Sequence, residues 1–170
     1  MERVVKSFAS LKKELKIIIQ EAGYVFPPEI PVNGGKISRG DNYQGLPYVV
    51  LDYPAVFSKS QVFAYRSMFL WGDCFSFTWQ FSGDCINTVR EKLVNSGDQL
   101  FNTSIFICVN SDPWQHHYKD DNYVLFTSDL LPILQNHSFI KLSQKIPLSD
   151  FSQLNTTSVD YFKFIADLLR

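Results

Sequence analysis

The densest group of side chains that could do chemistry lies in the segment 112–121, which reads D-P-W-Q-H-H-Y-K-D-D. In a helix, Asp112, His116 and Asp120 would share one face, because each follows the previous one by one helical turn. Histidine and carboxylate groups are ordinary ligands of zinc and iron, and a histidine can also act as a general acid or base near neutral pH. One hypothesis is therefore a metal-assisted enzyme that uses these three residues together with His117.

The same segment also has the composition of an exposed connecting loop, and this is the interpretation that we favour. Pro113 and the polar residues around it are typical of a loop between two strands. No further ligand follows at a spacing known from metal sites, and in an extended chain His116 and His117 point to opposite sides. The sequence therefore predicts no metal and no other cofactor, and it favours a protein that is not an enzyme.

A second candidate site is a charged residue in a region that is otherwise rich in aromatic residues. From residue 45 to residue 83 the charged side chains are Asp52, Lys59, Arg66 and Asp73. A charged group among apolar neighbours must be paired, stacked or functional, because its transfer out of water is costly. We expect Arg66 either to stack on the indole of Trp79 or to form an ion pair with Asp52.

This arrangement suggests a binding protein for a small anionic or aromatic ligand. A guanidinium group in an aromatic pocket can anchor an anion. Tyr48 and Tyr65 could each assist with a hydroxyl group from the same region. The hypothesis requires a cavity beside Arg66, and it fails if Arg66 only stacks on Trp79.

The strand that would carry Trp79 is predicted from a strict alternation. Every second residue is aromatic in the run formed by Phe75, Phe77, Trp79 and Phe81. A period of two residues is typical of a β-strand. The segment before it is compatible with a partner strand, and Gly72-Asp73 fits a two-residue hairpin turn. Pairing of Trp71 with Cys74 then places Arg66 opposite Trp79.

This register would place aromatic rings on both faces of the hairpin. One face would carry the aromatic run together with Arg66, and the other would carry Tyr65, Phe69 and Trp71. Rings on two faces are more than one domain core is expected to cover. The leading functional hypothesis is therefore self-association or binding of a protein partner, with Tyr65, Phe69 and Trp71 at the interface.

The rest of the chain predicts an α+β fold. An apolar seam from Val4 to Ala22 repeats at helical spacing, which indicates an amphipathic N-terminal helix that ends near Gly23. We expect strands at 46–53, 104–110, 123–127 and 139–146, a tight turn at 32–36, inserted helices at 84–96 and after 128, and an amphipathic C-terminal helix at 157–169. Residues 1–170 would thus form one domain, in which two terminal helices bracket an antiparallel, aromatic-rich sheet.

Composition argues against several classes of protein. The chain has 170 residues, of which 45% are hydrophobic and 19% charged, and its formal net charge is −1. This balance does not favour a nucleic-acid-binding surface. No apolar run is long enough to span a membrane, and lysines interrupt the N-terminal segment where an export signal needs an apolar stretch. The three cysteines show neither metal-binding nor disulfide spacing, so we expect a cytoplasmic location.

Overall fold

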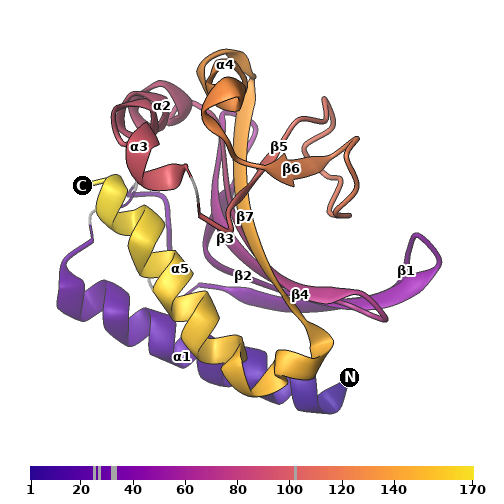
Figure 1. Ribbon diagram of the computed structural model, residues 1–170. Coiled ribbons are helices and arrows are strands. Elements are labelled where there is room, and N and C mark those ends of the chain that lie inside the picture. Colours follow the sequence, from indigo (N-terminus) through magenta and orange to yellow (C-terminus); the bar gives the residue numbers. More distant parts are fainter. Residues whose placement is uncertain (25, 27, 32–33, 102) are drawn as a thin grey trace.

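The computed structural model describes residues 1–24, 26, 28–31, 34–101 and 103–170 (Figure 1). Within these ranges seven strands form one sheet in the order β1-β2-β3-β4-β7-β5-β6, and all paired strands are antiparallel. The strands are β1 (Lys36–Tyr43), β2 (Leu46–Phe57), β3 (Gln61–Leu70), β4 (Cys74–Gly83), β5 (Phe106–Cys108), β6 (Tyr123–Leu125) and β7 (Phe139–Pro147). The predicted α+β fold with an antiparallel sheet is confirmed.

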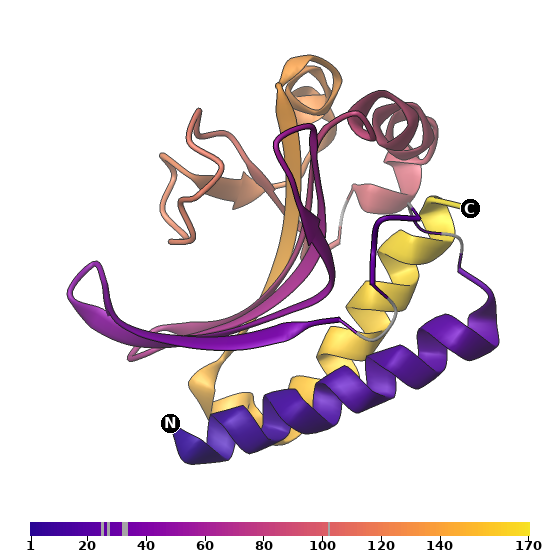
Figure 2. The same ribbon diagram turned by 180° about the vertical axis from the view of Figure 1, so that it is seen from behind.

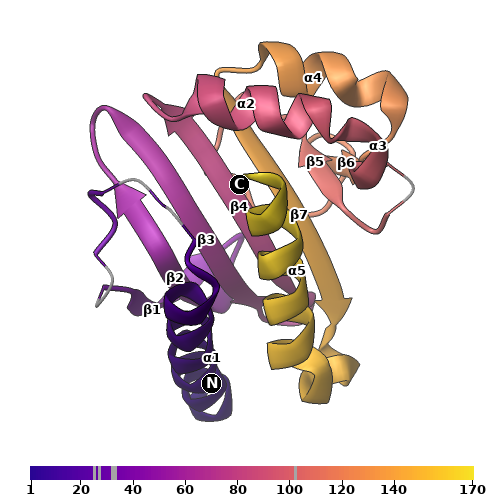
Figure 3. The same ribbon diagram turned by 90° about the vertical axis from the view of Figure 1, so that its left-hand side faces the viewer.

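The helices lie on one face and at one end of this sheet. They are α1 (Glu2–Ala22), α2 (Ile86–Asn95), α3 (Gly97–Leu100), α4 (Leu131–Asn136) and α5 (Leu154–Leu168), with 3-10 turns η1 (Ser128–Leu130) and η2 (Leu148–Gln153). Figure 3 shows α1 and α5 along the sheet, while α2, α3 and α4 gather at one end. The two terminal helices therefore bracket the sheet as predicted, although α5 begins earlier than expected.

The apolar seam of α1 faces the interior. Val4, Phe8, Leu11 and Leu15 are buried in the main core. The helix ends at Gly23, whose φ of 64° is a left-handed conformation that glycine adopts at little cost. Residues 32 and 33 of the predicted tight turn lie outside the described residues.

The register of the β3–β4 hairpin differs from the prediction by one residue. Arg66 pairs with Thr78 rather than Trp79, and Tyr65 pairs with Trp79. The reason is the turn, in which the backbone N–H of Asp73 donates to the carbonyl of Leu70 at 3.1 Å. Gly72, with a φ of 74°, takes the third position of this turn, where a type II turn requires a glycine. The loop is thus one residue longer than a two-residue hairpin turn.

A shift of one residue moves every side chain of a strand to the opposite face. The helix-covered face therefore carries the rings of both strands, namely Phe63, Tyr65 and Phe69 of β3 and Phe75, Phe77, Trp79 and Phe81 of β4. Trp79 stacks on Phe162 of α5, with ring centroids 5.1 Å apart. The prediction of rings on both faces is wrong: Tyr65 and Phe69 belong to the core, whereas Trp71 lies in the turn and is 46% exposed.

The other face of the sheet carries both polar and apolar side chains and is partly covered. Figures 1 and 2 show the sheet bending away from α1 and α5, with the segment between β5 and β6 on its concave side. Several buried polar side chains lie on this face, namely Ser76, Thr78, Gln80, Lys141 and Ser143. Residues 109–122, between β5 and β6, are here called the covering segment. The curvature of the sheet and this segment together create the environment of the candidate site.

Candidate functional site

Asp52 and Arg66 are brought together by the pairing of β2 with β3. They are direct partners in the register, so their side chains emerge side by side on the concave face. The Arg66 Nε donates to Asp52 Oδ1 at 2.7 Å, and Nη2 donates to Oδ2 at 3.1 Å. The predicted ion pair is confirmed with bidentate geometry, and the stacking of Arg66 on Trp79 is wrong because the two side chains lie on opposite faces.

His116 is the third member of this cluster. Its Nε2 lies 3.1 Å from Arg66 Nη1. A guanidinium group can only donate, so Nε2 must accept and the imidazole is neutral with its proton on Nδ1. Burial, together with the charges of Lys141 and Arg66, lowers the pKa of His116 well below its usual value. The ring is therefore an uncharged hydrogen-bond acceptor near neutral pH.

Tyr43 fastens the covering segment to the sheet. Its hydroxyl oxygen accepts hydrogen bonds from the backbone N–H groups of His116, at 2.7 Å, and His117, at 3.0 Å. The burial of the Tyr43 ring raises the pKa of its phenol. Tyr43 is the last residue of β1, an edge strand of the sheet, so this strand holds the covering segment over the concave face.

The segment 112–121 is not helical, so the face predicted for a metal site does not form. Asp112 accepts from the Trp114 backbone N–H at 2.9 Å and from Gln115 Nε2 at 2.7 Å, and these hydrogen bonds lower the pKa of its carboxyl group. His117 pairs with Asp121 at 3.0 Å, and Asp120 is exposed. Among the described residues, no three His, Cys, Asp or Glu side chains are grouped so that they could hold a metal ion.

Lys141 is a buried cation that the sequence did not single out. Its ammonium group donates to the Gln115 carbonyl at 2.6 Å and lies 5.0 Å from the centroid of the Tyr123 ring. Burial lowers the pKa of Lys141 to about 8. The signal available in the sequence was only its place in the strand predicted at 139–146, whose alternation indicates a half-exposed strand.

A hydroxyl network lies beside Lys141 on the same face. Thr78 Oγ1 and Ser143 Oγ are 2.7 Å apart, and the Tyr118 hydroxyl forms a short hydrogen bond with Ser143. The Tyr118 ring stacks on Tyr123, with centroids 4.7 Å apart. The covering segment is thus joined to β7 by polar contacts and to β6 by ring stacking.

A cavity of about 310 Å³, here called the concave cleft, lies beside the Arg66–Asp52 pair. Its lining comes from β1, β2, β3 and the covering segment: Ser38, Tyr43, Tyr48, Val50, Asp52, Arg66, Met68, Trp114 and His116. Trp114 is 49% exposed. Of the predicted ligand-binding residues, Arg66, Asp52 and Tyr48 meet in this cleft, whereas Tyr65 and Trp79 face the helices.

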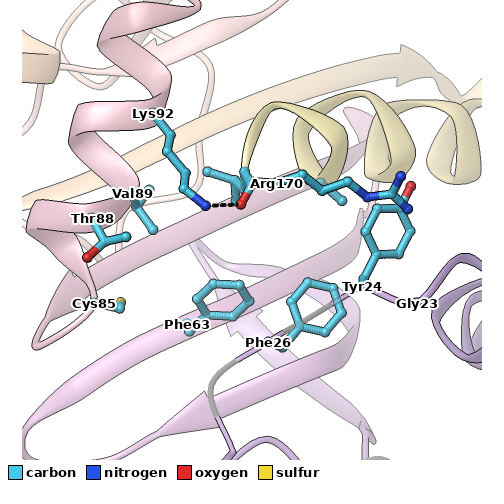
Figure 4. Close-up of a pocket in the computed structure, with 11 residues that line it drawn as sticks. Gly23, Tyr24, Phe26, Phe63, Cys85, Thr88, Val89, Lys92 and Arg170 are labelled. Atoms are coloured by element: carbon cyan, nitrogen blue, oxygen red, sulfur yellow. Dashed lines mark hydrogen bonds between the residues drawn. The ribbon is translucent and has the colours of Figure 1, made fainter.

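A larger cavity of about 510 Å³, here called the helix-side pocket, lies where the ends of α1 and α5 approach α2. Figure 4 shows the rings of Tyr24, Phe26 and Phe63 around it, with Lys92 reaching across from α2. The Lys92 ammonium donates to the Leu169 carbonyl at 2.6 Å. Sequence reasoning missed this pocket because it depends on how α1, α2 and α5, which are distant in the sequence, meet beside β3.

Comparisons of the chain with protein-family models, with curated proteins and with solved structures find no significant match. No helix in the described ranges combines the length and the apolar character needed to cross a bilayer. A functional assignment therefore depends on the chemistry of the two cavities.

Proposed function

We propose that this protein binds a small organic acid with a planar ring in the concave cleft. The observation that carries the proposal is the cavity of about 310 Å³ beside Arg66, into which polar groups from three strands and one loop converge. Cavities of this size are typical of small-molecule sites, and a few convergent polar groups orient the ligand in them.

The guanidinium of Arg66 keeps capacity to bind an anion despite its ion pair. It has five N–H donors. Three of them are used in hydrogen bonds to Asp52 and His116. The other two donate to no acceptor in the part of the chain that the structure describes, although the guanidinium lies 5.6 Å from the centroid of the Phe57 ring, so a carboxylate could accept from them. The bidentate pair with Asp52 fixes the plane of the guanidinium in advance, which lowers the entropic cost of binding.

The surroundings of the cleft favour an anion with an aromatic body. The ammonium group of Lys141 donates to the carbonyl of Gln115, the neighbour of His116 in the chain, rather than to a carboxylate. Its charge, like that of Arg66, lowers the pKa of His116, so both cations act on this region. Trp114 contributes an indole ring to the wall, against which a planar ligand can stack.

The test uses Trp114 as the reporter, in protein that carries Trp71→Phe so that the other exposed tryptophan is silent. Benzoate and salicylate are titrated, with benzamide as the uncharged control. We expect a saturable change in Trp114 emission with the two acids. Arg66→Lys keeps the positive charge but loses the planar set of guanidinium N–H donors, so we expect it to weaken binding about tenfold.

A blocking variant shows whether the response comes from the cleft. Ser38→Phe fills the cleft from the outermost strand, whereas Asn42→Phe adds the same ring at an exposed position of that strand. We expect the first to abolish the response and the second to keep it. An equal response of both variants, or no saturable response in the parent protein, would overturn the proposal.

A further inference from the structure

The helix-side pocket offers an apolar cavity with two cationic side chains, Lys92 and Arg170, at its edge. The Phe26 and Phe63 rings form part of its wall, with their centroids 5.5 Å apart. Val89, Ala166 and Leu169 add aliphatic surface. A volume of about 510 Å³ exceeds that of the concave cleft, and the wall can shield an extended apolar group from water.

Of the two cations at this edge, Lys92 is the one that no carboxylate among the described residues neutralises. Lys92 forms no ion pair with any described residue, and its hydrogen bond goes to the carbonyl of Leu169 at 2.6 Å. Arg170 lies at the same edge, but its guanidinium pairs with Asp167 at 3.7 Å and lies 4.4 Å from the centroid of the Tyr24 ring. An anionic group at this edge would gain a charge-assisted hydrogen bond from Lys92.

We propose that the helix-side pocket binds an amphipathic organic acid, such as a medium-chain fatty acid. Its apolar chain would lie against Phe26 and Phe63, and its carboxylate would accept from Lys92. The pocket lies on the opposite face of the sheet from the concave cleft, because Phe63 and Arg66 point to opposite sides of β3. This site is therefore independent of the proposed function, and each proposal can fail without the other.

The structure provides a reporter for occupancy of this pocket. Trp79 is fully buried, and its ring centroid lies 5.6 Å from that of Phe63 and 6.3 Å from that of Phe26. Bromine quenches an indole only at close range, so a brominated ligand in the pocket should quench Trp79. The probe is ω-bromododecanoate, and the protein carries Trp71→Phe and Trp114→Phe so that Trp79 is its single tryptophan.

We expect saturable quenching by ω-bromododecanoate below its micellar concentration. Lys92→Gln should weaken binding of the acid about tenfold and leave binding of the uncharged ω-bromododecanol within about twofold. Lys163→Gln, an exposed position on α5, is the matched control and should bind both probes like the parent.

A second measurement follows the thiol of Cys85, which lines the pocket and is half-buried. Dodecanoate should slow its alkylation by iodoacetamide, measured by peptide mass. Absence of both quenching and protection would overturn the proposal. If the acid and the alcohol lose affinity equally in Lys92→Gln, the assignment of the carboxylate to Lys92 is wrong.

Discussion

Lys141 is a residue whose charge is strongly affected by the fold. Its side chain is completely buried, and burial lowers its pKa to about 8. In the unfolded chain the pKa of a lysine is about 10.4. Between these two pH values the unfolded chain holds a proton that the folded chain has released, so the free energy of unfolding rises with pH. The cost of the buried charge is fully present below about pH 8.

This difference predicts a pH-dependent effect of Lys141→Met. We expect the unfolding free energy of the parent protein to rise by roughly 3 kcal/mol, relative to the variant, as the pH increases from the folded to the unfolded pKa. Urea unfolding of both proteins at a series of pH values measures this difference, because titrations that do not depend on Lys141 are common to the two proteins. Parallel profiles for the two proteins would show that the folded pKa of Lys141 is not lowered.

Two glycines, Gly83 at the end of β4 and Gly72 in the turn before it, differ in how closely other backbone atoms approach them. Gly83 has a φ of 71°, and a Cβ there would overlap the carbonyl oxygen of Ser60. Gly72 has a φ of 74°, but no other atom lies near its Cβ position. Substitution by alanine at Gly83 therefore adds a steric clash to the strain of a left-handed backbone, whereas at Gly72 it adds the strain alone.

We expect Gly83→Ala to lower the free energy of unfolding by roughly 3 kcal/mol or more and Gly72→Ala by about 1 kcal/mol. Chemical denaturation of the two variants and the parent protein gives both values. Equal losses at the two positions would contradict a close approach of Gly83 to Ser60.

The elements with a clear periodicity were predictable from the sequence, and their mutual placement was not. The seam of α1 and the alternation in β4 are local patterns, and both elements form as predicted. The register of β4 depended on whether Gly72 occupies the second or the third position of its turn, which composition alone does not decide. An error of one residue there moved Arg66 from the face of Trp79 to the concave face.

The candidate site was predictable only in part, for a similar reason. The ion pair of Arg66 with Asp52 followed from two charges in an apolar region. The approach of His116 did not, because it requires the sheet to bend and the covering segment to reach Tyr43 of the outermost strand. Contacts between segments so distant in the sequence leave no periodic pattern in either of them.

For the whole molecule, self-association stays a prediction. The exposed apolar surface that could support it is smaller than the sequence suggested. Of the three residues expected at an interface, Trp71 is the one with substantial exposure, and Leu46, also 46% exposed, lines the same shallow depression. Stable interfaces bury about 800 Å² on each partner, far more than two side chains provide. We therefore expect weak self-association, detectable by sedimentation at high micromolar concentration and removed by Trp71→Ser. A monomer over the whole concentration range would contradict it.

Side chains of β3 alternate between the two faces of the sheet, so one short segment contributes both to the main core and to the concave cleft. Phe63, Tyr65 and Phe69 pack in the core, whereas Arg66 and Met68 line the concave cleft. Substitutions at Phe63, Tyr65 and Phe69 would therefore act mainly on folding, whereas Arg66 contributes to what the cleft can recognise. Mutation and selection could change the specificity of the cleft at Arg66 while the main core stays the same.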